Sequence, residues 1–77
     1  MKELENIISE KLSTIGEIIE FWEIKGYKGQ YNFIIKTNEN IMDLLEAKSV
    51  ISKHLGDIKS HTHCLEGYNR IWTQISI

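Results

Sequence analysis

Two glycine–tyrosine pairs, Gly26-Tyr27 and Gly67-Tyr68, each stand between two runs of β-branched and aromatic residues. Such runs around a glycine-bounded turn predict β-hairpins, because glycine readily adopts the positive φ that a tight turn requires. The first hairpin is expected over residues 15–37 and the second over residues 57–77. Most of the chain is therefore predicted to form antiparallel strands.

A stretch with apolar residues at helical spacing precedes each hairpin, over residues 2–12 and again over residues 41–55. Asn38 or Asn40 is expected to cap the second helix. The sequence therefore predicts one small α+β domain spanning residues 1–77, of order αββαββ. We expect an antiparallel sheet of about four strands with both helices packed on one face.

The two halves of the chain, residues 1–37 and 38–77, also resemble each other. A shift of forty positions places Leu4 on Leu44 and Gly16 on Gly56. Each half would be a helix and a hairpin, a unit too small to bury its own apolar face. An internal duplication about a pseudo-two-fold axis is one interpretation, and chance similarity is the alternative.

Length and composition limit the setting in which the chain works. With 77 residues it is close to the lower size limit for a self-sufficient core, so we expect a homodimer, which would bury further surface. Its one cysteine cannot form an internal disulfide, and no charged-then-apolar leader opens the sequence. These features predict a reducing, cytoplasmic location. No apolar run approaches the ~20 residues of a membrane span, so no membrane partner is expected.

Charge and motifs argue against several functional classes. The formal net charge is −2 and Arg70 is the sole arginine, which disfavours nucleic acid as the principal partner. The chain has no glycine-rich phosphate loop, nucleophile elbow or HExxH helix. We therefore predict neither an enzyme nor a cofactor.

The stretch HTHC, residues 61–64, combines two histidines with the only cysteine. A turn at residues 67–68 would pair Cys64 with Ile71 on the core face, whereas His61 and His63 would share the other face with Trp72. Because neighbouring residues in a strand face opposite sides, Cys64 would lie away from both histidines. A metal site at His61 and His63 is kept as an alternative that lacks the third ligand zinc needs.

The face turned away from the helices is the predicted protein interface. In the first hairpin a turn at Tyr27-Lys28 would put Trp22 with Phe33 in the core. The other face would then display apolar and aromatic side chains from both hairpins: Ile19, Phe21, Ile34, His61, His63 and Trp72. A contiguous patch with aromatic residues usually marks an interface, with a second copy or with another protein. A shift of one residue in register would exchange the two faces.

Nucleic-acid binding at the hairpin tips is a second alternative. An exposed tyrosine beside cationic side chains can stack a base and hold a phosphate. The candidate residues are Lys25, Tyr27, Lys28, Tyr68 and Arg70. Abundant isoleucine and lysine without proline are typical of an AT-rich genome, such as those of many bacteria and phages. By type, the chain is predicted to be a small protein-binding regulator or inhibitor of the kind that phages and mobile elements encode.

Overall fold

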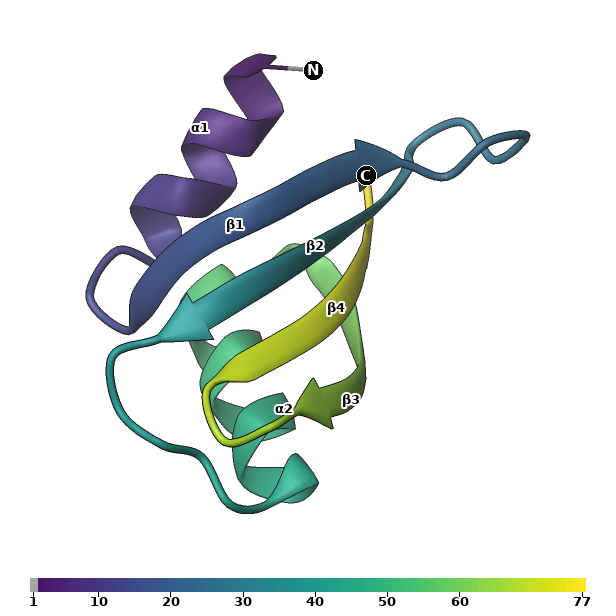
Figure 1. Ribbon diagram of the computed structural model, residues 1–77. Helices are drawn as coiled ribbons and strands as arrows, with labels where there is room; N and C mark the ends of the chain where they lie inside the picture. Colours follow the sequence, from purple (N-terminus) through teal and green to yellow (C-terminus); the bar gives the residue numbers. More distant parts are fainter. Residues whose placement is uncertain (1) are drawn as a thin grey trace.

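The computed structural model describes residues 2–77 and confirms the predicted order of elements (Figure 1). The elements are α1 (Lys2–Lys11), β1 (Gly16–Glu23), β2 (Gln30–Thr37), α2 (Leu44–Leu55), β3 (Lys59–Glu66) and β4 (Arg70–Ser76). The four strands form one antiparallel sheet in the order β1-β2-β4-β3. Among residues 2–77, no helix has the length and apolar character needed to cross a membrane.

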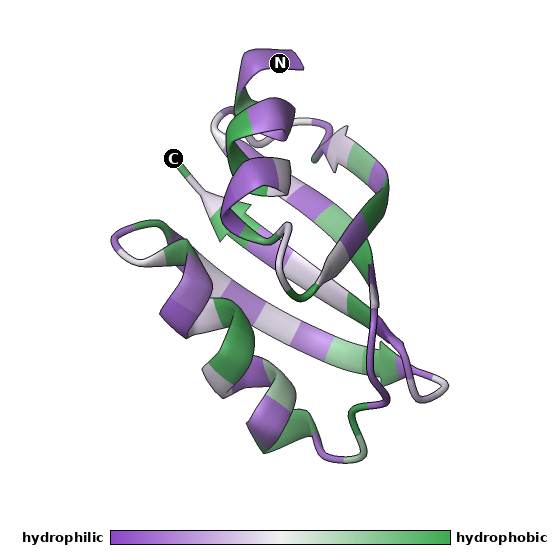
Figure 2. Cartoon of the chain, turned by 90° about the vertical axis from the view of Figure 1, so that its left-hand side faces the viewer, coloured by the Kyte–Doolittle hydropathy of each residue, from purple (hydrophilic) through white to green (hydrophobic). Residues whose placement is uncertain are grey.

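Both helices lie against the same face of the sheet and close a single core. Ile8 of α1 and Ile51 of α2 are fully buried against Phe33, Ile35 and strand β4. Figure 2 shows hydrophobic and hydrophilic residues alternating around both helices, as expected for helices that bury one side. Among residues 2–77, no helix lies on the opposite face of the sheet.

The second helix begins later than its apolar pattern predicts. Its N-cap is Asp43, whose Oδ1 accepts a hydrogen bond from Leu45 N at 3.1 Å, so the predicted caps Asn38 and Asn40 were wrong. Ile41 N donates instead to Tyr68 O at 2.6 Å, which ties this segment to the tip of the second hairpin. This backbone partner is why Ile41 is held outside the helix.

The register of the first hairpin corrects the predicted assignment of Trp22 and Phe21. Gly26 and Gly29 take φ of 85° and 83° in two consecutive turns, and Glu23 pairs with Tyr31. This six-residue loop shifts the pairing by one residue, so Phe21 faces the core and Trp22 faces outward. A bulge between Ile18 and Glu20 shifts the pairing by a further residue, so Ile35 pairs with Ile18 and not with Glu20, the partner that the two-residue turn would give.

The second hairpin carries a bulge of its own. His61 pairs with Gln74 as predicted, but the register shifts between Thr62 and Cys64. Cys64 therefore stands opposite Trp72, not Ile71, and it joins the histidine face. The prediction that Cys64 points into the core was wrong, because strict alternation ends where a bulge inserts an extra residue.

The arrangement of the two halves is compatible with a pseudo-two-fold relation. Strands β2 and β4, the second strand of each hairpin, adjoin at the centre, while β1 and β3 form the edges. When the first half is shifted by forty positions, however, buried Ile8 aligns with exposed Lys48, whereas α2 buries Ile51. The internal duplication therefore stays a prediction.

Candidate functional site: the open face of the sheet

The face of the sheet that no helix covers is called the open face here, and its cross-strand pairs form rows. At one end is a charged row that crosses all four strands: Glu17, Lys36, Arg70 and Glu66. The next row contains Glu20, Ile34, Trp72 and Cys64, and the one after it contains Trp22, Asn32, Gln74 and His61. One end of the open face is therefore charged, whereas its middle is largely aromatic and amide.

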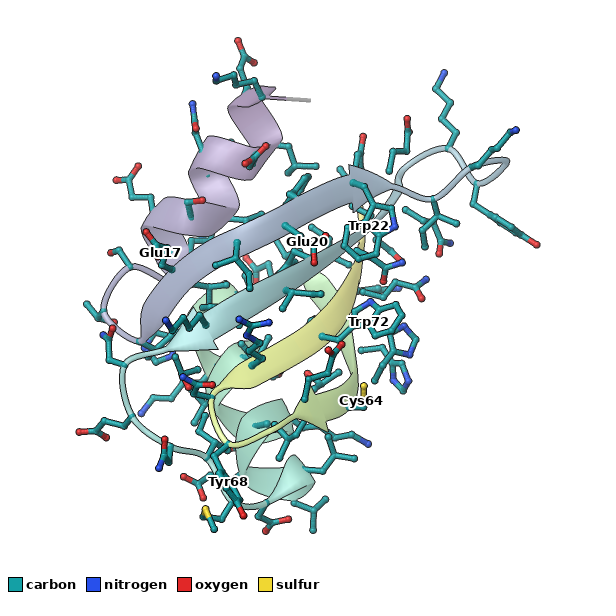
Figure 3. The ribbon with its side chains drawn as sticks, in the orientation of Figure 1. Glu17, Glu20, Trp22, Cys64, Tyr68 and Trp72 are labelled. Atoms are coloured by element: carbon teal, nitrogen blue, oxygen red, sulfur yellow. The ribbon has the colours of Figure 1, made fainter. Side chains whose placement is uncertain are left out.

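Four rings lie in sequence across this middle part, and we call them the aromatic row: Trp22, Trp72, His63 and His61. The centroids of Trp22 and Trp72 are 6.1 Å apart, those of Trp72 and His63 5.8 Å, and those of the two histidines 4.9 Å. The two indoles come from β1 and β4 and meet across β2 (Figure 3). Ring pairs at these separations attract one another beyond simple area burial.

The structure places five of the six predicted interface residues on the open face. Ile19 is 37% exposed at the β1 bulge, while Ile34 is only 9% exposed beside Trp72. Phe21 is the exception: it packs against the core and stacks on Phe33 at 6.3 Å. The interface prediction for Phe21 was therefore wrong, because the register differs by one residue from the expected one.

Sequence reasoning missed Trp22, the residue that exchanges faces with Phe21. The signal that could have found it is the repeated Lys-Gly pair at residues 25–26 and 28–29. Each glycine has a positive φ within a separate turn, so the loop is longer than a two-residue hairpin turn. Counting the pairs outward from this longer loop puts Trp22 opposite Asn32.

A chain of hydrogen bonds orients the polar side chains beside the aromatic row. Gln74 Nε2 donates to Gln30 Oε1 at 2.5 Å, which leaves Gln74 Oε1 to accept from His63 Nε2 at 3.1 Å. In a neutral ring, His63 then carries its proton on Nε2 and a free lone pair on Nδ1. This hydrogen bond orients the imidazole against Trp72.

Two polar atoms in the same area have no hydrogen-bond partner among residues 2–77. They are Trp72 Nε1 and Asn32 Oδ1, both buried. A buried polar atom without a partner costs roughly 1–3 kcal/mol, and such atoms are a few per hundred residues in folded proteins. They lie in neighbouring rows of the open face, Trp72 beside Ile34 and Asn32 beside Trp22.

The alternative metal site can now be compared with the geometry. The β3 bulge brings Cys64 to the same face as His61 and His63. Within residues 2–77, however, no three His, Cys, Asp or Glu side chains are arranged to hold a metal ion. His54 Nδ1 forms a hydrogen bond with Val50 O within α2, and His54 does not join His61 and His63. Two imidazoles alone fall short of a zinc site.

The predicted nucleic-acid residues do not form one surface. Tyr27 and Tyr68 are 63% and 61% exposed, but their turns lie at opposite ends of the sheet, because β2 and β4 are antiparallel. Six residue steps separate the pair Gln30–Ser76 from the pair Lys36–Arg70. At about 3.3 Å per residue the two tips are roughly 20 Å apart. Lys25, Tyr27 and Lys28 thus lie apart from Tyr68 and Arg70, and the two hairpin tips cannot both contact the same nucleotide.

Comparison with protein-family models, with curated proteins and with solved structures found no match to this chain.

Proposed function

We propose that this chain is a non-enzymatic protein-binding domain, a regulator or inhibitor whose open face docks a partner protein. The observation that supports it is the aromatic row on a sheet face that no helix covers. Tryptophan is among the residues most enriched in binding hot spots, and such residues cluster at the centre of an interface. Trp22 and Trp72 are the proposed anchors.

The face is a better docking surface than either edge of the sheet. Both edge strands carry a β-bulge, between Ile18 and Glu20 in β1 and between Thr62 and Cys64 in β3. Bulges twist an edge away from added strands and are a common protection against edge-to-edge pairing. A partner strand that extended the sheet would meet an interrupted ladder on either side.

The charges around the aromatic row indicate the chemistry of the partner. Lys25 and Lys28 lie in the loop at the end of the sheet near Trp22, and Lys59 begins β3 at the same end. Glu20 lies on the open face in the same row as Trp72. A partner with an apolar centre, an acidic margin that faces the three lysines and no carboxylate opposite Glu20 would complement these features, and opposite charges speed association. We therefore propose an acidic-rimmed protein surface as the occupant.

Area indicates that the occupant contacts more than the flat face of the sheet. Strands about 4.8 Å apart and seven residues long present roughly 400 Å² of flat face. A stable interface takes about 800 Å² from each partner. A partner that also contacts the projecting 24–29 loop gains area that two flat faces pressed together would not. The homodimer remains a prediction for the test below.

Site-specific photo-crosslinking in the source cell tests the proposal. A photoreactive residue replaces His61 on the open face, and a matched control replaces exposed Lys53 on α2. We expect one discrete product from position 61 that Trp72→Ala abolishes. With the purified partner, calorimetry should show a loss of affinity of at least tenfold for Trp22→Ala or Trp72→Ala and no change for Lys53→Ala.

Three results would contradict the proposal. A product of twice the 9.0 kDa chain mass would assign the face to a second copy. Equal labelling from positions 61 and 53 would remove the face as a specific surface. A single-stranded oligonucleotide whose binding falls steeply with salt and with Lys28→Glu would favour the nucleic-acid alternative.

A further inference from the structure

His61 and His63 lie side by side at an edge of the sheet. Both belong to the edge strand β3, both are exposed, and their ring centroids are 4.9 Å apart. Side chains two residues apart in a regular strand are about 6.6 Å apart. The bulge between Thr62 and Cys64 makes His63 the extra residue of β3, and a bulge commonly re-aims a side chain. The two rings are therefore closer together than regular strand geometry would place them.

The separation of the two rings matches that of two histidines bound to one zinc ion. Zinc binds imidazole nitrogens at about 2.0–2.1 Å in tetrahedral geometry, which places the two ring centroids about 5 Å apart. The rings now meet edge to face, with their planes at 87°. Rotation about the Cβ–Cγ bond turns the nitrogens of a histidine without displacing its centroid, and this torsion is broad. Rotation of the exposed His61 ring can therefore direct both side chains at one metal ion.

His63 has the outer hydrogen bond that is typical of a metal ligand. Its Nε2 donates to Gln74 Oε1 at 3.1 Å, and Gln74 Nε2 donates in turn to Gln30 Oε1. Metal-ligating histidines almost always donate their other ring N–H to an oxygen acceptor, which orients the ring. The second nitrogen of His63, Nδ1, is then the one that can bind a metal.

Two ligands are too few for zinc, so the pair needs ligands from another molecule. Structural zinc sites have four protein ligands. Among residues 2–77, no third His, Cys, Asp or Glu is arranged with His61 and His63 to hold a metal ion. A second copy related by a two-fold axis would bring an identical pair of histidines to the same point, because such an interface uses the same surface of both chains. Two copies thus supply the four ligands.

We propose that a zinc ion joins two copies of this chain through His61 and His63 of each copy. The bridge lies at the β3 edge, whereas the docking of another protein is assigned to Trp22 and Trp72, so neither depends on the other. Imidazole suits zinc, whereas hard cations such as magnesium take oxygen ligands. Lys59, two residues before His61, is exposed, and its flexible stem allows the ammonium to extend away from the metal.

Sedimentation velocity and calorimetry with zinc chloride as the probe provide the test. We expect the purified protein to bind one zinc per two chains and to double in mass, with EDTA reversing both changes and magnesium chloride causing neither. His61→Ala and His63→Ala should each abolish the doubling and weaken zinc binding at least tenfold, since loss of even an outer hydrogen-bond partner costs roughly 10–100-fold. His54→Ala is the matched control, because His54 is hydrogen-bonded within α2, and it should change nothing.

Three results would overturn the zinc bridge. Zinc binding without a change in mass would assign the metal to a single chain, and its loss in Cys64→Ser would identify the thiol as a further ligand. A doubling of mass that persists in His61→Ala, or that magnesium also causes, would place the contact between copies elsewhere. Absence of zinc binding in the calorimeter would exclude the site altogether.

Discussion

Buried polar atoms differ in their hydrogen bonding between the two faces of this sheet, the covered face on which both helices pack and the open face. On the covered face, the hydroxyls of Thr62 and Thr73 are buried and lie 3.3 Å apart in a hydrogen bond to each other. On the open face, Trp72 Nε1 and Asn32 Oδ1 are buried without a partner among residues 2–77. The buried hydroxyls of the covered face are therefore paired with each other, whereas these two atoms of the open face are not.

The two faces also bury their apolar residues by different means. Phe33 is buried because α1 and α2 close over it. Ile34, its neighbour in β2, reaches 9% exposure with no helix above it, since Trp72 is its cross-strand partner and Glu20 stands on its other side. Burial of Ile34 on the open face therefore depends on neighbouring side chains and not on a covering helix.

The largest effect is expected for Phe33→Ala on the covered face. Removing this 0%-exposed ring should lower the free energy of unfolding by about 3–5 kcal/mol. A domain of this length has a total of only about 4–12 kcal/mol, so the variant should be largely unfolded at 37 °C. Urea denaturation followed by circular dichroism measures it. Ile19→Ala on the open face is the control. An equal loss of unfolding free energy in that variant would contradict the difference between the two faces.

Adjacent residues of β1 provide a sharper comparison. Phe21→Ser removes a ring packed on Phe33 and should cost about 2–4 kcal/mol, whereas Trp22→Ser should cost about half as much. The same urea titrations give both values. If Trp22→Ser proved the more damaging, the pairing of Glu23 with Tyr31 would be wrong by one residue.

The pair of Thr62 and Thr73 tests whether hydrogen bonding between buried hydroxyls stabilises the covered face. Thr73→Val leaves the Thr62 hydroxyl buried and unpaired, at a cost of about 1–2 kcal/mol. Thr62→Val combined with Thr73→Val should recover most of that loss, because no polar atom is then stranded. A double-mutant cycle measures the coupling. Strictly additive losses would show that the hydrogen bond contributes nothing.

The smallest effect, of opposite sign, is expected for Asn32→Leu on the open face. Replacing an amide whose oxygen lacks a partner with an apolar group of similar size should raise stability by roughly 1 kcal/mol. In a domain this small, the corresponding increase in Tm is about 4–8 °C by calorimetry. A lower Tm would mean that the Asn32 side chain has a stabilising partner, such as a bound water.

Much of the fold could be predicted because it depends on local pattern. Helical periodicity and the glycine-bounded strand runs identified both helices and both hairpins, and the packing of two helix–hairpin units predicted that the helices share one face. The open face was also predicted, with Ile19, Ile34, His61, His63 and Trp72 on it. These features follow from the spacing of apolar residues along a short segment, which the chain carries whatever its tertiary contacts.

Which residues of β1 and β3 face outward was decided by the tertiary structure. Two bulges and a loop with two turns each shift the pairing by one residue, and one residue is enough to exchange Phe21 for Trp22 and to turn Cys64 outward. Bulges are set by packing across strands, which no single segment encodes. Local pattern was enough to predict the layers and the open face, whereas the side chains that meet on that face depend on long-range pairing.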